Sequence, residues 1–365
     1  MKTQKTNSQD CNKVAIAEAE CFVCNCLKKV GANNATAKAV TRALTSTSGQ
    51  GIDSHGIRLL PHYLKVLQGG RINGNPVLNF KALSAATGTL DADNGFGHLA
   101  GYRAIEEGIK LAEASGVGAV TVTNSSHFGA AGCYTLAAAE AGYLALALSN
   151  SDKLVLAHDG LAPFHGTNPF SFAAPVKGQA PFLLDMATSS IPLNRALHYQ
   201  SMGQPLPPDV AVDSDGAMTT DAHQFSALLP LGGKTYGYKG AALAGMCEVL
   251  SAAVTGMAFS HQLLAINSPD LATPRKLGHF FLVMRPEAFI STDTYEEQIA
   301  AYLADLRNQS AVSGAQVMAP GDREWEVLRE RQSTGIPVDP FLWASLAEIA
   351  STLNVPTMTP LPLRQ

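Results

Sequence analysis

The sequence has few charged residues and no run of basic ones. Of its 365 residues, 15% are charged, and 26 lysines and arginines stand against 30 acidic residues, for a formal net charge of −4. Nucleic-acid binders usually carry a basic patch, and anionic membranes attract clustered lysines and arginines. We therefore expect neither nucleic acid nor a membrane as a partner. The hydrophobic share of 46% indicates a folded globular chain.

A clear membrane span and a signal peptide are also missing. The longest apolar stretch, residues 241–259, consists mostly of small side chains and contains Glu248. Because a carboxylate is costly in a lipid-facing helix, this stretch predicts a helix inside a folded protein. Residues 1–10 are polar and lack the apolar core of a secretory signal. These features predict a cytoplasmic protein whose first ten residues form a frayed tail.

The six cysteines do not complete a metal site. Cys21, Cys24 and Cys26 lie close together, but no second Cys/His pair with zinc-finger spacing follows. In a helix over 14–30, Cys21 and Cys24 would share the apolar face and Cys26 would point away. We interpret the cysteines as free thiols, small and buried in this cluster, and expect no bound metal.

A glycine-rich dinucleotide fingerprint is absent as well. The pattern G-x-G-x-x-G between a strand and a helix marks a Rossmann domain. The nearest segment, residues 95–101, has one residue too many between its second and third glycines. It lies between a possible strand over 89–93 and a helix, so we interpret it as a tight turn at a helix start, with contact to a cofactor phosphate as the alternative. The residues alone do not predict a Rossmann domain.

What the sequence does contain is an alternation of strand and helix patterns. Gly- and Pro-bearing loops separate these segments, which places the middle of the chain in the α/β class. Strands are expected at 118–123, 144–148, 170–176, 182–186 and 280–285, and helices at 14–30, 35–47, 57–68, 130–141, from 239 onward, and at 295–308, 322–332 and 340–353.

Three clusters hold the side chains that can carry chemistry. The first runs from Asp53 to Arg58 and is followed by Tyr63. The Arg58 guanidinium suits a carboxylate, and His55 can carry a proton near neutral pH. The alternative is that Ser54 caps the next helix and His55 is a solvated loop residue.

The second cluster, residues 124–129, lies between a predicted strand and the helix after it. Active sites of α/β proteins favour the carboxyl ends of strands, so His127 is well placed as a general acid or base. The alternative is that Ser125 or Ser126 only caps the following helix.

The third cluster combines residues 166–169, 185–190 and 236–240. Lys239 is predicted to begin a long apolar helix, where its charge would oppose the helix dipole. A bound anion, such as a cofactor phosphate, would reconcile the two because both the lysine and the helix N-terminus attract it. A lysine that only reaches water is the alternative.

Taken in order, these motifs resemble the type-2 malate/L-lactate dehydrogenase family. That family also contains ureidoglycolate, sulfolactate, diketogulonate and piperideine- or pyrroline-2-carboxylate oxidoreductases. The likeness covers nearly the whole chain from about residue 14 and rests on Asp-Ser-His-Gly at 53–56, Gly-Gly-Arg-Ile-Asn at 69–73, Ser-His-Phe-Gly at 126–129, Gly-Thr-Asn-Pro at 166–169, Asp-Met-Ala-Thr-Ser at 185–189, Tyr-Lys-Gly at 238–240, Pro-Gly at 320–321 and Gly-Ile-Pro at 335–337.

The resemblance implies an α/β fold that is not Rossmann, with a largely antiparallel sheet in the cofactor domain. Residues 1–80 and 290–365 would form one helical dimerisation domain and residues 81–289 the nicotinamide domain, in a homodimer or larger homo-oligomer. The implied activity is NAD- or NADP-dependent hydride transfer between nicotinamide and a small 2-hydroxy or 2-oxo acid. Reduction of a cyclic or N-alkyl imino acid is the alternative.

The resemblance also implies roles for individual residues. His127 would be the catalytic acid or base, with His55 beside it. Cofactor contacts would come from Ser151, Asp185, Met186, Ala187 and Lys239, and we expect the substrate near Ser54, Arg58, Tyr63 and Asn168.

The departures from the family pattern concern mainly the substrate. Leu59 stands where many members carry arginine, and Asn194 with Arg195 stands where they often carry glycine followed by lysine or aspartate. Arg275 and Lys276 would suit a cofactor 2′-phosphate, with a solvated loop as the alternative.

Overall fold

A computed structural model describes residues 11–362, so the segment 1–10, where we expected a frayed tail, lies outside the described residues. The centre is a seven-stranded sheet in the order β2-β3-β4-β12-β5-β8-β9, in which only β3 and β4 pair in parallel. The expected α/β fold with a largely antiparallel sheet is confirmed. The strands are β2 Asn79–Ala82, β3 Thr87–Asp91, β4 Val117–Ser125, β5 Leu144–Ser149, β8 Phe170–Ala174, β9 Phe182–Met186 and β12 Leu277–Met284.

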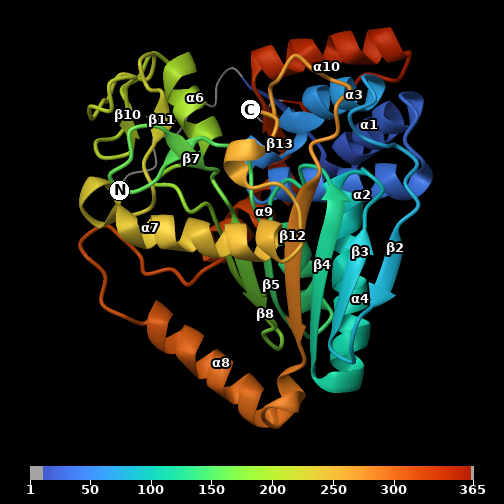
Figure 1. The fold of residues 1–365 in the computed structure, drawn as a ribbon, viewed down its shortest axis with the longest axis vertical. Coiled ribbons are helices and arrows are strands. Elements are labelled where there is room, and N and C mark those ends of the chain that lie inside the picture. The colour runs from blue at the N-terminus through green and yellow to red at the C-terminus, as the bar shows by residue number, and fades with distance from the viewer. Residues whose placement is uncertain (1–10, 363–365) are drawn as a thin grey trace.

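Strand direction brings several loops to one edge of this sheet. β12 runs antiparallel to both β4 and β5, and β8 runs antiparallel to both β5 and β9. The carboxyl ends of β4, β5 and β9 therefore meet the beginnings of β8 and β12 at the same edge. We call it the upper edge, after its place in Figure 1. The residues that follow β4, β5 and β9 include most of the candidate site.

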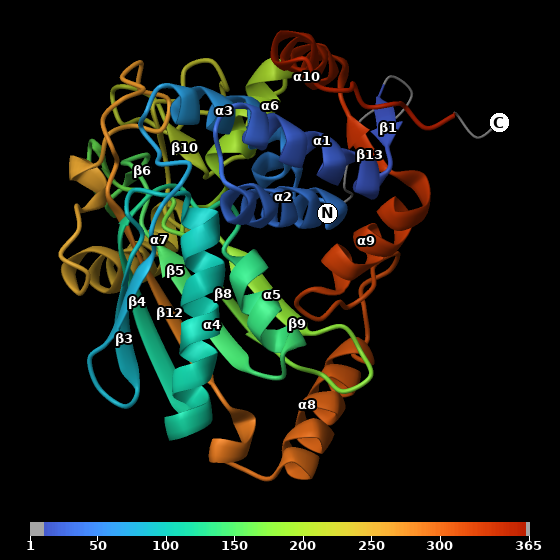
Figure 2. The ribbon, with the colours of Figure 1, turned by 90° about the vertical axis from the view of Figure 1, so that its right-hand side faces the viewer.

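Helices cover both faces of the sheet (Figures 1 and 2). On one face, α4 and α5 share a buried core with alternate residues of β4, β5 and β12. In β4 these are Gly118, Val120 and Val122, as the two-residue period of a strand requires. α7 and a π-helical turn, η3, contact β5 and β12 from the other face. The bounds are α4 Gly97–Ser115, α5 Gly132–Glu140, α7 Gly233–Glu248 and η3 Val249–Ala253.

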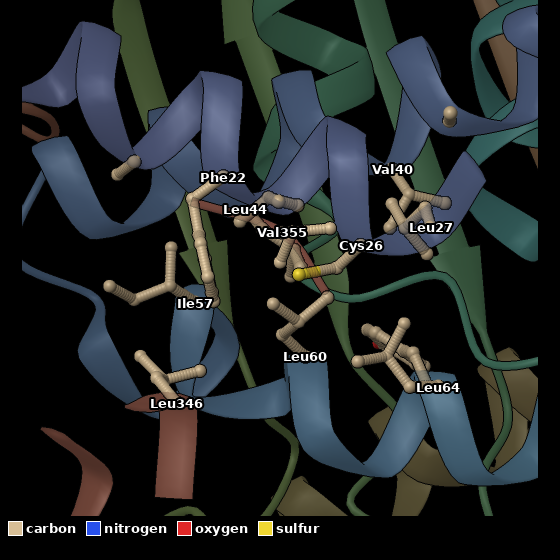
Figure 3. Packing of buried hydrophobic residues seen from close by; sticks show 14 of the residues in the cluster. Phe22, Cys26, Leu27, Val40, Leu44, Ile57, Leu60, Leu64, Leu346 and Val355 are labelled. Atoms are coloured by element: carbon tan, nitrogen blue, oxygen red, sulfur yellow. The ribbon is translucent and has the colours of Figure 1, made fainter. Parts of the chain in front are cut away.

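A layer of helices above the upper edge is built from both ends of the chain. α1 and α2 pack with α3 and α10 around one core, in which Phe22, Leu44, Leu60 and Leu346 converge (Figure 3). β1 pairs with β13 beside this core. The expected division into two domains remains a prediction. The bounds are β1 Asn12–Val14, α1 Ile16–Lys29, α2 Asn34–Gly49, α3 Leu60–Gln68, β13 Ile336–Val338 and α10 Pro340–Leu353.

The remaining elements lie around this framework. A small sheet in the order β10-β11-β6-β7 and the helix α6 lie beside the upper edge, whereas α8 packs its Leu303 against Val176 in the lower part. The bounds are β6 Val155–Leu156, β7 Pro163–His165, β10 Ala211–Val212, β11 Ala227–Leu228, α6 Leu193–Ser201, α8 Thr292–Arg307, α9 Asp322–Thr334, and the short 3-10 turns η1 Asp53–His55, η2 Ile57–Leu59, η4 Ser260–Gln262 and η5 Pro286–Ala288.

The expected orientation of the cysteines in α1 is wrong. Cys26 is fully buried and points into the core of Figure 3, whereas Cys21 is exposed and Cys24 is half-buried. The reason is the helical period, since Phe22, Cys26 and their neighbours form the buried stripe. Within residues 11–362, no group of three or more His, Cys, Asp or Glu side chains is placed to hold a metal ion.

The start of α7 also differs from the prediction. The helix begins at Gly233, after Gly232 turns the backbone with a φ of 100°, so Lys239 lies in its second turn rather than at its N-terminus. The predicted conflict with the helix dipole is therefore removed, because the dipole acts mainly on the first turn. Glu248 ends the helix as a buried residue, and no helix in the described part of the chain is long and apolar enough to span a membrane.

Gly97, the first residue of α4, lets this helix approach the loop after β4. A Cβ atom there would lie 2.3 Å from the backbone oxygen of Ser126 and 2.9 Å from that of His127. We predict that Gly97→Ala lowers the free energy of unfolding by about 1–3 kcal/mol, the usual cost of overpacking, in urea denaturation. The control is Gly245→Ala in α7, where an added Cβ meets nothing within 4 Å. It should be neutral or stabilising by up to about 1 kcal/mol, and equal losses in both variants would contradict the packing argument.

Candidate active site

The loop that carries His127 is tied to the start of α4. β4 ends at Ser125, and the hydroxyl of Ser126 accepts the Gly97 N–H (3.1 Å) and donates to the Gly95 carbonyl (2.9 Å). Ser126 therefore binds the start of α4, which precedes it in the chain, and does not cap α5, which follows it. The alternative that Ser126 only caps the following helix is wrong. The Gly95–Gly97 turn thus serves as a packing surface for the His127 loop.

A buried histidine that sequence reasoning missed joins this loop to the next one. His279 in β12 bonds Ser125 Oγ through Nε2 and Ser149 Oγ through Nδ1, each at 2.8 Å. Its ring stacks on Phe128, with centroids 4.6 Å apart. Ser125 and Ser149 are the last residues of β4 and β5, and β12 lies between these two strands. The His279 imidazole on β12 therefore holds both strand ends. A signal existed in the sequence, because a histidine inside an apolar strand needs polar partners.

Three predicted residues meet at the upper edge. Tyr63, on α3, places its hydroxyl 2.6 Å from Nδ1 of His127, and the His55 ring stacks on the His127 ring with centroids 6.2 Å apart. Ser54 Oγ lies 2.9 Å from Nδ1 of His55. Tyr63 is fully buried, so its hydroxyl is engaged by His127 rather than open to a substrate. In this structure the hydroxyl holds the His127 ring, and the expected contact of Tyr63 with the substrate remains a prediction.

Burial governs the ionisation of these groups. It lowers the pKa of His127 well below its usual value, and the positive charge of Arg275 lowers it further. Burial also lowers the pKa of His55 to about 4 and raises the pKa of the Tyr63 hydroxyl. At neutral pH, both imidazoles are neutral and the tyrosine is protonated. Because Nδ1 of His127 faces Tyr63, Nε2 is the nitrogen left for chemistry.

Another histidine lies behind Tyr63 and was also missed. His98 is fully buried, and its ring meets the Tyr63 ring edge-on at 5.0 Å. Neither of its nitrogens has a hydrogen-bond partner in the described part of the structure. Burial lowers the pKa of His98 to about 3, so it packs as a neutral ring.

The residues expected at the cofactor lie along the same edge. Ser151 Oγ accepts the Thr167 N–H at 3.0 Å, which joins the loop after β5 to the one before β8. Asp185, in β9, accepts the Gly132 N–H at 2.9 Å, and burial raises the pKa of Asp185 to about 6. Met186 ends β9 and Ala187 follows it, both half-buried.

Lys239 reaches this region from the other face of the sheet. Its neighbour Gly240 donates to the Leu231 carbonyl, and Leu231 donates to the Thr188 carbonyl just beyond β9. The Lys239 side chain is exposed, with Nζ 5.3 Å from the ring centroid of Tyr236 and 6.0 Å from that of Tyr238.

Two residues expected at the substrate are engaged elsewhere. Arg58 is exposed and pairs with Asp339, the N-cap of α10. Asn168 is fully buried, donates to Glu248 (2.8 Å) and accepts from the Ser151 N–H (3.0 Å). Asn168 therefore joins the loops at this edge, and its expected contact with the substrate remains a prediction.

Asn194 and Leu59, which depart from the family pattern, contact the His55 loop and the helical layer. Asn194 donates to the Ser54 carbonyl at 2.9 Å, so α6 touches the His55 loop. Leu59 packs against the core of the helical layer. Arg275 does not lie in a solvated loop, because it is buried and forms an ion pair with Asp152. This ion pair occupies one of the nitrogens that a cofactor phosphate would need.

The chain matches a known protein family and is similar to known proteins along most of its length. The family model described as malate/L-lactate dehydrogenase matches residues 14–347. A malate dehydrogenase of Pyrococcus abyssi is 32% identical over 355 residues, which span 95% of this chain and 97% of that protein.

Solved structures give the same result. A malate dehydrogenase of Entamoeba histolytica superposes with a TM-score of 0.90 at 28% identity, covering 97% of this chain and 100% of that one. A delta1-piperideine-2-carboxylate reductase of Pseudomonas syringae pvar. tomato superposes with a TM-score of 0.81 at 29% identity, covering 93% and 99%.

The buried histidines predict that the fold loses stability in acid. Burial lowers the pKa of both His98 and His279 to about 3, from an ordinary value of 6.5. Between these values the unfolded chain binds protons that the folded chain excludes, so the free energy of unfolding falls as the pH falls. Each residue should contribute up to about 1.4 kcal/mol per pH unit. We predict that His279→Asn weakens this dependence in urea denaturation at several pH values. His223→Asn, on the surface, is the control; an unchanged slope in His279→Asn would refute the assignment.

Proposed function

The chain belongs to the malate/L-lactate dehydrogenase family, and from this premise we propose that it transfers a hydride between NAD or NADP and a small 2-hydroxy or 2-oxo acid. The observation that carries the proposal is the His127 imidazole at the upper edge, held through Nδ1 by Tyr63 and stacked on His55. An acid or base with one nitrogen anchored and the other free is what oxidation of an alcohol or reduction of a carbonyl requires.

The residues at the upper edge fit a nicotinamide dinucleotide. Lys239 is an exposed cation that forms no ion pair among residues 11–362 and lies near two exposed tyrosine rings, so it suits a phosphate. We assign the cofactor to Lys239 together with Ser151 and with Asp185, Met186 and Ala187 at the end of β9. When bound, the nicotinamide accepts or supplies the hydride.

In the oxidation direction, His127 acts as the base. Its lowered pKa keeps the imidazole neutral, so Nε2 has a lone pair for the substrate hydroxyl proton. Tyr63 then accepts the Nδ1–H, which fixes the tautomer and the ring orientation. In the reduction direction the protonated His127 donates the same proton to the oxygen of the substrate. The stacked His55 limits the space on one side of the ring.

Imino-acid reduction is the second candidate function. The observation that favours it is the similarity to the piperideine-2-carboxylate reductase, which covers nearly all of both chains. In that reaction the hydride reaches a C=N carbon, and the carboxylate beside it is the same as in a 2-oxo acid.

A substrate panel tests the proposal. The purified protein is mixed with NADH or NADPH and with pyruvate, oxaloacetate, phenylpyruvate, a sugar-derived 2-oxo acid or piperideine-2-carboxylate, and the loss of nicotinamide absorbance is followed. We expect turnover of at least one 2-oxo acid. Turnover of the imino acid alone would select the second function. Failure of every combination, together with failure to bind either cofactor, would refute both.

Variants of the Tyr63–His127 pair test the assigned roles. We predict that His127→Ala lowers kcat by ~10²–10⁴-fold, the usual contribution of a positioned acid or base. Tyr63→Phe removes one hydrogen bond and keeps the buried ring, so kcat should fall by roughly 10-fold with KM little changed. Reduced-nicotinamide fluorescence on binding is the control and should be the same in both variants. Near-normal turnover of His127→Ala would remove it from the mechanism.

A further inference from the structure

Arg275 lies across the sheet edge from His127. β12 begins at Leu277, which pairs with Ser125, the last residue of the antiparallel strand β4. Arg275 stands two residues before Leu277, and His127 stands two residues after Ser125. The strand register therefore brings the two side chains to the same part of the upper edge, although they are far apart in the sequence.

The Arg275 side chain is buried and only partly satisfied. It is 3% exposed, its Nε donates to the Leu264 carbonyl at 2.7 Å, and its Nη2 pairs with Asp152. Nη1 is buried and has no hydrogen-bond partner among residues 11–362. Because an unmet donor on a buried cation is costly, the site has a place for one more acceptor, and an anion is the acceptor that a guanidinium favours.

The other cations near the His55 loop do not compete for this role. Arg58, our first candidate for a carboxylate, pairs with Asp339 outside the site. Arg71 donates from Nη1 and Nη2 to the backbone carbonyls of Ile266, Ser268 and Asp270, so both nitrogens are engaged in anchoring the loop before Arg275. Among these three described arginines, Arg275 combines an unpaired buried Nη1 with a position that the β4–β12 register brings to the same edge as His127.

We propose that Arg275 binds the carboxylate of the substrate through Nη1, while Nη2 keeps its ion pair with Asp152. This inference rests on the proposed function and specifies its substrate as an acid whose carboxylate lies next to the carbon that exchanges the hydride. A guanidinium held by Asp152 offers the carboxylate a fixed donor, which orients the neighbouring carbon toward His127.

The electrostatics agree with this arrangement. The pKa of His127 is lowered by burial and, among its charged neighbours, by the permanent positive charge of Arg275, while its Nδ1 bonds Tyr63. A bound carboxylate would offset the Arg275 charge and relieve one of these effects. Arg275 therefore links substrate binding to the protonation of His127.

The test compares an acid with its amide in two arginine variants. Pyruvate and pyruvamide are assayed with the wild type, Arg275→Gln and Arg71→Gln, and oxamate binding to the complex with reduced nicotinamide is measured by calorimetry. For Arg275→Gln we expect oxamate affinity and the kcat/KM for the acid to fall about 100-fold, the usual loss when one partner of a buried charge pair is removed. The ratio of kcat/KM for pyruvate to that for pyruvamide should fall as well.

The Arg71→Gln variant controls for a purely structural role, because Arg71 ties down the same loop through Nη1 and Nη2 but lies outside the β4–β12 register that leads to His127. It should keep the preference for acid over amide. For pyruvate reduction, in which His127 must be protonated, the alkaline limb of the kcat/KM profile should move to higher pH in Arg275→Gln, since one charge that lowers the His127 pKa is gone. Thermal melting and cofactor binding check that each variant folds. If Arg275→Gln does not fold, Arg275→Lys replaces it in the same assays.

The possible failures are distinguishable. If the wild type turns over 2-oxo acids and Arg275→Gln binds oxamate as tightly as the wild type, Arg275 does not hold the carboxylate and only this inference falls. Equal losses of acid preference in Arg71→Gln and Arg275→Gln would assign Arg275 to the loop instead. If the wild type neither binds oxamate nor turns over any acid of the panel, the proposed function falls and takes the inference with it.

Discussion

The geometry of the upper edge depends on one buried imidazole. His279 bonds Ser125 on one side and Ser149 on the other, so it sets the distance between the ends of β4 and β5. His127 and Ser151 each follow their serine by two residues, which places the proposed proton-transfer group and a proposed cofactor contact relative to one strand. Burying this neutral imidazole costs little free energy because both ring nitrogens are hydrogen-bonded.

The helical layer supplies the other half of the site. Tyr63 belongs to the core formed by α1, α2, α3 and α10, and it reaches His127 because that layer sits on the upper edge. Both ends of the chain build the layer, since β1 pairs with β13 and Leu346 of α10 packs with Leu60 of α3. The orientation of His127 therefore depends on packing among segments from both ends of the chain. Burial at this junction also keeps the imidazoles neutral.

The two arginines show why sequence proximity is a poor guide to a site. Arg58 is close to His55 in the chain, but it lies on a short 3-10 turn that directs it to Asp339 at the surface. Arg275 has no neighbouring motif residue, yet the pairing of β12 with β4 brings it to the same edge of the sheet as His127. In a mixed sheet, register decides which distant side chains meet.

The sequence by itself determined the fold class, the approximate extent of most elements and the family, because periodicity, breakers and the order of motifs are local properties of the chain. It also singled out His55, Tyr63 and His127, which the structure brings together. Only the tertiary structure decided the partners: Asp339 for Arg58, Glu248 for Asn168, the two serines for His279 and Asp152 for Arg275. These pairs join segments distant in the chain, and strand register and helix packing, which no local pattern encodes, bring them within hydrogen-bond distance.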